Sequence, residues 1–159
     1  MSERKINPQV AEFVARLGML DAGERARLKR SAGMALAESR NVLGLFYRLL
    51  PYGVPGYQEE SYFLVATLFP LAKPGEQGDL GTALRHARST QNSKGLDRRV
   101  EILLDSDAAQ LPFRLRQAIH FLGSAEQPVN WVTLLEDLLS WNHQNRFVQK
   151  HWARSYYSE

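Results

Sequence analysis

The 159-residue sequence contains no cysteine. Without a thiol the chain can form no disulfide bond, no thiolate nucleophile and no zinc site with cysteine ligands. Long apolar segments are also missing, because charged residues interrupt every candidate before the roughly 18–20 residues that a membrane span needs. The start of the chain, MSERKINPQV, has no apolar signal-peptide core, so we expect a cytoplasmic protein without a membrane partner.

The surplus of positive charge is small. The chain has 20 Lys and Arg against 17 Asp and Glu, which gives a net charge of +3. This balance permits an anionic partner, but many solvated helical surfaces carry as much, so charge alone leaves nucleic-acid binding open. The hydrophobic content of 44% is typical of a globular protein, either one compact domain or two small lobes.

Signals for helices recur along the chain, whereas sustained alternation of apolar and polar residues does not. Asn7 before Pro8 is a helix start, Asp21 and Glu24 have the spacing of a capping box, and Asp79 can cap another helix. The strongest amphipathic stripe is formed by Trp131, Leu134, Leu135, Leu138 and Leu139. The sequence therefore predicts an all-α fold of seven or more helices in two small helical-bundle lobes, residues 1–90 and 91–159.

Two segments allow more than one interpretation. Residues 61–69, SYFLVATLF, are apolar nearly all round, so they fit a buried strand or a buried helix, and their flanks favour the helix. Asp105 and Asp107 have the first spacing of a calcium loop. However, Gln110 and Arg116 occupy the positions that require Gly and a bidentate Glu, so we expect the two aspartates to cap the next helix instead.

No pattern in the sequence indicates catalysis. The four histidines show no metal-ligand spacing, and no Ser/His/Asp order, carboxylate pair or phosphate-binding loop stands out. We therefore expect no enzymatic activity, no catalytic residues, no metal and no cofactor. A nuclease is disfavoured because no carboxylate cluster for a metal is apparent.

The C-terminal segment 145–157, NRFVQKHWARSYY, separates into two stripes when it is plotted at about 100° per residue. One stripe is apolar and aromatic, with Val148, Trp152 and Tyr156. The other is basic, about 200° away, with Arg146, Lys150 and Arg154. A base-stacking arm needs its aromatic rings beside its cations. We therefore expect Trp152 to be buried against the helix of residues 131–138, and the three cations to face phosphates from outside.

Several runs together resemble one known family. They are YFLVATLFPLA, DLGTALRHA, RRVEILLDSDAAQLPFRLRQAIHFL, VNWVTLLEDLLSWN and RFVQKHWARSYY, with RLKRSAG and FYRLLP before them. In order and spacing they resemble the CasB family, the small subunit of the type I-E CRISPR Cascade surveillance complex. The resemblance covers nearly the whole chain and rests on spaced Arg, Leu and Trp residues, without a catalytic signature.

The resemblance implies an all-helical, non-catalytic protein of two lobes that is present as a pair among the other Cascade subunits. Family members contact the guide RNA and target DNA and help to hold the displaced strand. Matching the family's basic segments to this chain gives the candidate nucleic-acid-binding residues Lys29, Arg30, Arg98, Arg99, Arg114, Arg116, Arg146, Lys150 and Arg154. Some of these must be structural, since Arg99 and Arg116 lie close to core positions.

Two functions remain in view. The first is a non-catalytic subunit that stabilises the R-loop of guide RNA and target DNA through a basic surface without reading sequence. Forming an R-loop exchanges one duplex for another at nearly equal free energy, so protein contacts to the backbone can favour it. The alternative is a helical module whose arginines bind acidic proteins and never contact nucleic acid. The salt dependence of binding to a random single strand separates the two.

Overall fold

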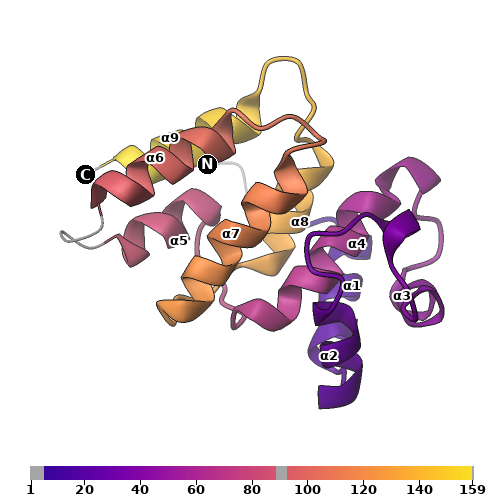
Figure 1. The fold of residues 1–159 in the computed structure, drawn as a ribbon. Helices are drawn as coiled ribbons and strands as arrows, with labels where there is room; N and C mark the ends of the chain where they lie inside the picture. The colour runs from indigo at the N-terminus through magenta and orange to yellow at the C-terminus, as the bar shows by residue number, and fades with distance from the viewer. Residues whose placement is uncertain (1–5, 89–92, 159) are drawn as a thin grey trace.

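The computed structural model describes residues 6–88 and 93–158. These residues form nine α-helices: α1 (Pro8–Gly18), α2 (Ala22–Lys29), α3 (Leu43–Leu49), α4 (Glu59–Leu68), α5 (Leu80–Ala87), α6 (Ser93–Leu104), α7 (Leu111–Ser124), α8 (Trp131–Leu139) and α9 (Phe147–Tyr157). Three 3-10 turns lie between them, η1 (Leu36–Glu38), η2 (Gly56–Gln58) and η3 (Phe69–Leu71). No strand occurs in these two ranges, so the predicted all-α class is confirmed (Figure 1).

The predicted helix starts are present because each depends on a local hydrogen bond. The Asn7 side chain accepts the backbone N–H of Gln9 at 2.9 Å. Asp21 and Glu24 form the complete capping box, with bonds of 2.8 and 3.1 Å. The Asp79 side chain accepts the N–H of Thr82 at 2.9 Å. Each side chain satisfies a backbone donor that the first turn of a helix leaves unpaired.

Residues 61–69 are almost entirely helical and buried all round. Helix α4 ends at Leu68, and every residue from Tyr62 to Leu68 is buried. Helices α2, α7 and α8 all contact α4, so apolar side chains on every side of it are covered. The helix that the flanking residues favoured is confirmed, and the strand interpretation is wrong.

Helices from both halves of the chain pack into one apolar core. Helix α5 packs most extensively against α9, and α8 contacts α1 and α4 (Figure 1). In the same view α5, α6 and α9 lie on one side, α1–α3 lie on the other, and α7 crosses between them. The division at residues 90/91 falls in the segment 89–92, outside the described residues, so the two-lobe division stays a prediction.

The contact between α5 and α9 brings their backbones close together. A Cβ atom at Gly81 of α5 would collide with the carbonyl group of Trp152 in α9. Only glycine leaves room for this approach, because every other residue carries a Cβ. The α5–α9 contact therefore holds the last helix in place by its backbone as well as by its side chains.

The apolar stripe of α9 faces inward, as its helical phase predicted. Val148, Trp152 and Tyr156 are all buried. The indole N–H of Trp152 donates to Asp137 of α8 at 2.8 Å, and its ring lies 5.1 Å from that of Trp141, centroid to centroid. The expected burial of Trp152 against the helix of residues 131–138 is therefore confirmed. In the described ranges no helix combines the length and the apolar character that crossing a membrane requires.

Candidate nucleic-acid interface

Two of the nine candidate residues meet at an open hollow between α6 and α7. Arg99 comes from α6 and Arg116 from α7, and both line a hollow of about 450 Å³. The other lining residues are Gln117, His120, Phe121 and Ser124. None of these described lining residues carries a carboxylate, whereas two of them are permanently cationic. The hollow therefore offers several hydrogen-bond donors to an anion and no acidic group that competes for the arginines.

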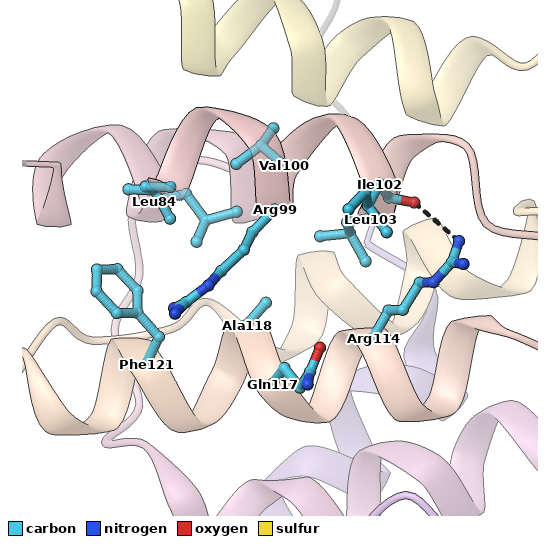
Figure 2. Close-up of a pocket in the computed structure, with 10 residues that line it drawn as sticks. Leu84, Arg99, Val100, Ile102, Leu103, Arg114, Gln117, Ala118 and Phe121 are labelled. Atoms are coloured by element: carbon cyan, nitrogen blue, oxygen red, sulfur yellow. Dashed lines mark hydrogen bonds between the residues drawn. The ribbon is translucent and has the colours of Figure 1, made fainter. Parts of the chain in front are cut away.

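Arg99 extends from α6 toward α7 and ends beside Phe121 (Figure 2). Its stem borders a second, smaller pocket of about 60 Å³, which is lined mainly by apolar side chains that include Val100 and Ala118. The expectation that Arg99 lies close to the core is correct for the stem, although the residue as a whole is exposed. Long cationic side chains commonly bury their methylenes and keep the charge in water.

Arg116 is joined to the turn that follows α2. A Cβ placed on Gly33 would lie 3.0 Å from Cδ of Arg116, so the turn packs directly on the arginine stem. Gly33 has a φ of +78°, a conformation that glycine adopts without strain. Lys29 and Arg30, both exposed, end α2 just before this turn. The structure thus brings the end of α2 next to the basic part of α7.

Arg114 and Arg146 have a different role, because both bind the C-terminal end of α6. Nη1 of Arg114 donates to the carbonyl of Ile102 at 3.2 Å (Figure 2). The same nitrogen donates to Oγ of Ser106 at 3.2 Å. Arg146 donates to the carbonyl of Leu104. The last carbonyls of a helix lack intrahelical partners and carry partial negative charge, which cations stabilise. These two arginines are therefore structural caps of α6.

The prediction that Arg146 belongs to the basic stripe of the last helix is wrong. Arg146 precedes the helix in the left-handed region, with φ 55° and ψ 40°, and α9 begins at Phe147. The Asn145 side chain accepts the N–H of Phe147 at 3.2 Å, and His143 accepts the N–H of Asn145. Such local side-chain bonds compete with helix formation, so the stripe keeps only two of its cations.

Three further candidates are exposed on the outer faces of their helices. Lys150 and Arg154 lie on α9, on the side away from its buried stripe, and Arg98 lies on α6. No ion pair or side-chain hydrogen bond joins any of the three to another described residue. They are available to an anionic partner, but the structure does not gather them with Arg99 and Arg116 at the hollow.

A carboxylate–phenol–guanidinium cluster ties α5, α6 and α9 together, and the sequence did not reveal it. Arg88 binds both carboxylate oxygens of Asp97, at 3.1 and 3.2 Å, and the Tyr156 hydroxyl donates to Asp97 at 2.5 Å. The hydrogen bonds from Tyr156 and then from Arg88 lower the pKa of Asp97. Burial and the bond to Asp97 raise the pKa of Tyr156. The partners are too far apart in sequence for a local pattern.

The two aspartates of the possible calcium loop behave differently. The side chain of Asp107 accepts the N–H of Gln110 at 2.9 Å, which confirms its capping role at the turn that leads into α7. Within the described residues no backbone N–H donates to the carboxylate of Asp105, whose Oδ1 lies 3.8 Å from Nη2 of Arg146 at an exposed surface, so the expected cap at Asp105 is wrong. Within residues 6–88 and 93–158 no group of three or more His, Cys, Asp and Glu is placed to hold a metal ion.

Known proteins of similar sequence and fold identify the family of this chain. The family model for CRISPR-associated protein Cse2 matches residues 24–157. A CRISPR-associated protein Cse2 from Thermus thermophilus is 36% identical over 124 residues, which are 72% of this chain and 70% of the relative. The crystal structure of M. ruber CasB is similar with a TM-score of 0.78 and 28% identity, covering 96% of this chain and 94% of that one.

A chain in E. coli Cascade bound to a PAM-containing double-stranded DNA target shares the fold. Its TM-score is 0.65 at 21% identity, and the match covers 96% of this chain and 98% of that chain. The family model spans most of the sequence, and the Thermus relative is well above 30% identity over more than two thirds of both chains. The predicted resemblance to CasB is thereby confirmed, and the chain belongs to the CRISPR-associated protein Cse2 family.

Proposed function

We propose that this protein is a non-catalytic subunit of a Cascade complex that holds nucleic acid by its phosphate backbone and so stabilises the R-loop. The observation that carries the proposal is the hollow between α6 and α7, where Arg99 and Arg116 come together with no carboxylate among the described lining residues. Membership of the Cse2 family supports the assignment to Cascade, as does the shared fold of the E. coli Cascade chain.

The chemistry of the hollow suits phosphate. An arginine presents a planar set of N–H donors that matches phosphate oxygens, and it stays charged at every relevant pH. Contacts to phosphate carry no sequence information, so such a surface binds any strand of the right shape. An R-loop exchanges one duplex for another at nearly equal free energy, and a few protein contacts to the backbone are enough to favour it.

We include the other exposed candidate residues in the phosphate-binding surface around the hollow. Lys29 and Arg30 end α2 just before the turn that packs on the stem of Arg116, and Arg98 shares α6 with Arg99. Lys150 and Arg154 add a separate basic strip on α9. The partners are the guide RNA, the target DNA, the other Cascade subunits and a second copy of this chain.

Charge reversal at the hollow tests the proposal. Arg99→Glu combined with Arg116→Glu should lower the affinity for a single strand of mixed sequence by roughly tenfold or more, because two phosphate contacts become repulsive. The loss should be the same for strands of different sequence. Fluorescence anisotropy of labelled strands measures both effects, and circular dichroism confirms that the variant is folded.

The matched control is Arg40→Glu combined with Arg48→Glu, which reverses two exposed arginines outside the hollow. This control should bind a single strand far better than the hollow variant does. Equal losses in the two variants would show that net charge alone governs binding. Binding of polyglutamate without binding of any strand would replace the proposal with the acidic-partner alternative.

A further inference from the structure

One aromatic side chain lies on the same exposed face of α7 as Arg116. Phe113 is 61% exposed, in the first turn of that helix. Residues three and four positions apart are neighbours on a helix surface, so Phe113 lies next to Arg116 and Gln117. His120 and Ser124 continue the same face by helical phase, and both line the hollow. An aromatic ring, a guanidinium group and the hollow lined by Arg99 and Arg116 therefore follow one another along α7.

Phe113 contrasts with the aromatic side chains of the core. Phe13, Phe46 and Tyr62 pack edge to face in the core, and Trp141 and Trp152 contact each other. Within the described residues no ring contact involves Phe113. A single exposed phenylalanine is ordinary on a protein surface. Its place beside a hollow with two arginines and no carboxylate among the described lining residues indicates a ligand with both an aromatic and an anionic part.

We propose that Phe113 and the Arg99–Arg116 hollow form one site for unpaired nucleotides. A base stacks on the ring of Phe113 while the neighbouring phosphates contact Arg116 and Arg99. This inference rests on the proposed function and adds to its phosphate contacts one residue that stacks a base. Proteins that bind single strands combine a basic groove with aromatic side chains, since every base offers a flat face. A duplex keeps its bases stacked on each other, so it contacts the arginines only.

Phe113→Ala tests the stacking contact. The affinity for a mixed-sequence single strand should fall roughly 5- to 20-fold, the lower part of the range for one stacked base. The affinity for a blunt-ended duplex and for an abasic strand of the same length should stay unchanged. The salt dependence should also be unchanged, because no phosphate contact is lost. Tyr57→Ala is the matched control, since Tyr57 is 85% exposed and does not line the hollow.

Phe113→Trp gives a direct readout of the same contact. The three native tryptophans, Trp131, Trp141 and Trp152, are all buried, so the introduced indole is the exposed fluorophore. A base-bearing strand should quench its emission, whereas an abasic strand or polyglutamate should not. Quenching by polyglutamate to the same extent would overturn the proposal in favour of an acidic peptide.

The experiments separate failure of this inference from failure of the proposed function. If Phe113→Ala binds single strands as the native protein does while the Arg99/Arg116 variant loses binding, the stacking site is wrong and the basic surface stands. If neither variant changes binding, both proposals fall. If wild-type protein binds abasic and base-bearing strands equally well, the stacking site is likewise overturned.

Discussion

Helices α9 and α7 both combine aromatic and basic residues, but they present them in opposite ways. In α9 the rings of Trp152 and Tyr156 are buried, while Lys150 and Arg154 face outward. In α7 the ring of Phe113 and the guanidinium of Arg116 share one exposed face. Helix α9 therefore turns its two buried rings away from its cations, and its exposed tyrosine, Tyr157, lies only at the last residue of the helix. Helical phase, and not the number of Arg, Trp and Tyr residues, decides which helix can stack a base and contact a phosphate with the same face.

The largest expected effect comes from removing the largest buried ring of α9, which tests whether the aromatic stripe of this helix belongs to the core. Trp152→Ala should lower the free energy of unfolding by about 3–5 kcal/mol, because it leaves a cavity in the core. It also removes the hydrogen bond to Asp137. Urea unfolding followed by circular dichroism measures the loss. Unchanged stability together with lost single-strand binding would mean that this ring belongs to the binding surface.

The second test addresses the backbone contact that holds α9 in place. Gly81→Ala should lower the free energy of unfolding by about 1–3 kcal/mol, since the new methyl group meets the carbonyl of Trp152. Gly95→Ala in α6 is the control, because a Cβ there meets no other atom within 4 Å. The control should be as stable as the native protein or slightly more stable. Equal thermal midpoints for the two variants would contradict the close approach.

The third test separates arginines that cap a helix from arginines that face solvent. Arg114→Ala should lower stability by about 1 kcal/mol, because it removes the donor to Ile102 and Ser106 at the end of α6. Arg98→Ala, on the outer face of α6, should change stability by less than about 0.5 kcal/mol. Thermal unfolding of both variants distinguishes the two roles. A larger loss for Arg98→Ala would reverse the assignment.

The smallest expected effect concerns the outward face of α9. Lys150→Gln combined with Arg154→Gln should reduce single-strand affinity by a few fold at low salt, since two exposed cations are lost. The reduction should be the same for base-bearing and abasic strands, because the two cations contact phosphates and not bases, and the rings of Trp152 and Tyr156 are buried. A loss confined to base-bearing strands would show that α9 stacks bases after all.

Features that depend on neighbouring residues could be predicted from the sequence. The caps at Asn7, Asp21 and Asp79 and the inward stripe of α9 follow from spacings of a few residues, and the structure contains them. Helical phase predicted the wrong start for α9, because the turn before it, where Asn145 accepts the N–H of Phe147, keeps Arg146 out of the helix. Local polar bonds of this kind leave only a weak trace in apolar periodicity.

Features that join distant segments could not be predicted. Arg146 caps α6 from 42 residues away, and Tyr156 binds Asp97 across 59 residues. The same limit applies to the hollow, because Arg99 and Arg116 come together only when α6 packs on α7. The resemblance to CasB marked nine basic residues of similar type. Only the packing of the helices distinguishes the pair at the hollow from Arg114 and Arg146, which cap a helix.

The salt dependence of single-strand binding tests the central claim most directly, which is that the hollow between α6 and α7 contacts phosphate. For a single strand, each phosphate contact contributes about 0.7 to the slope of log affinity against log salt concentration. Arg99→Gln combined with Arg116→Gln should therefore reduce the slope by about 1.4. A slope equal to that of the native protein would contradict the claim, because it would mean that neither arginine contacts phosphate.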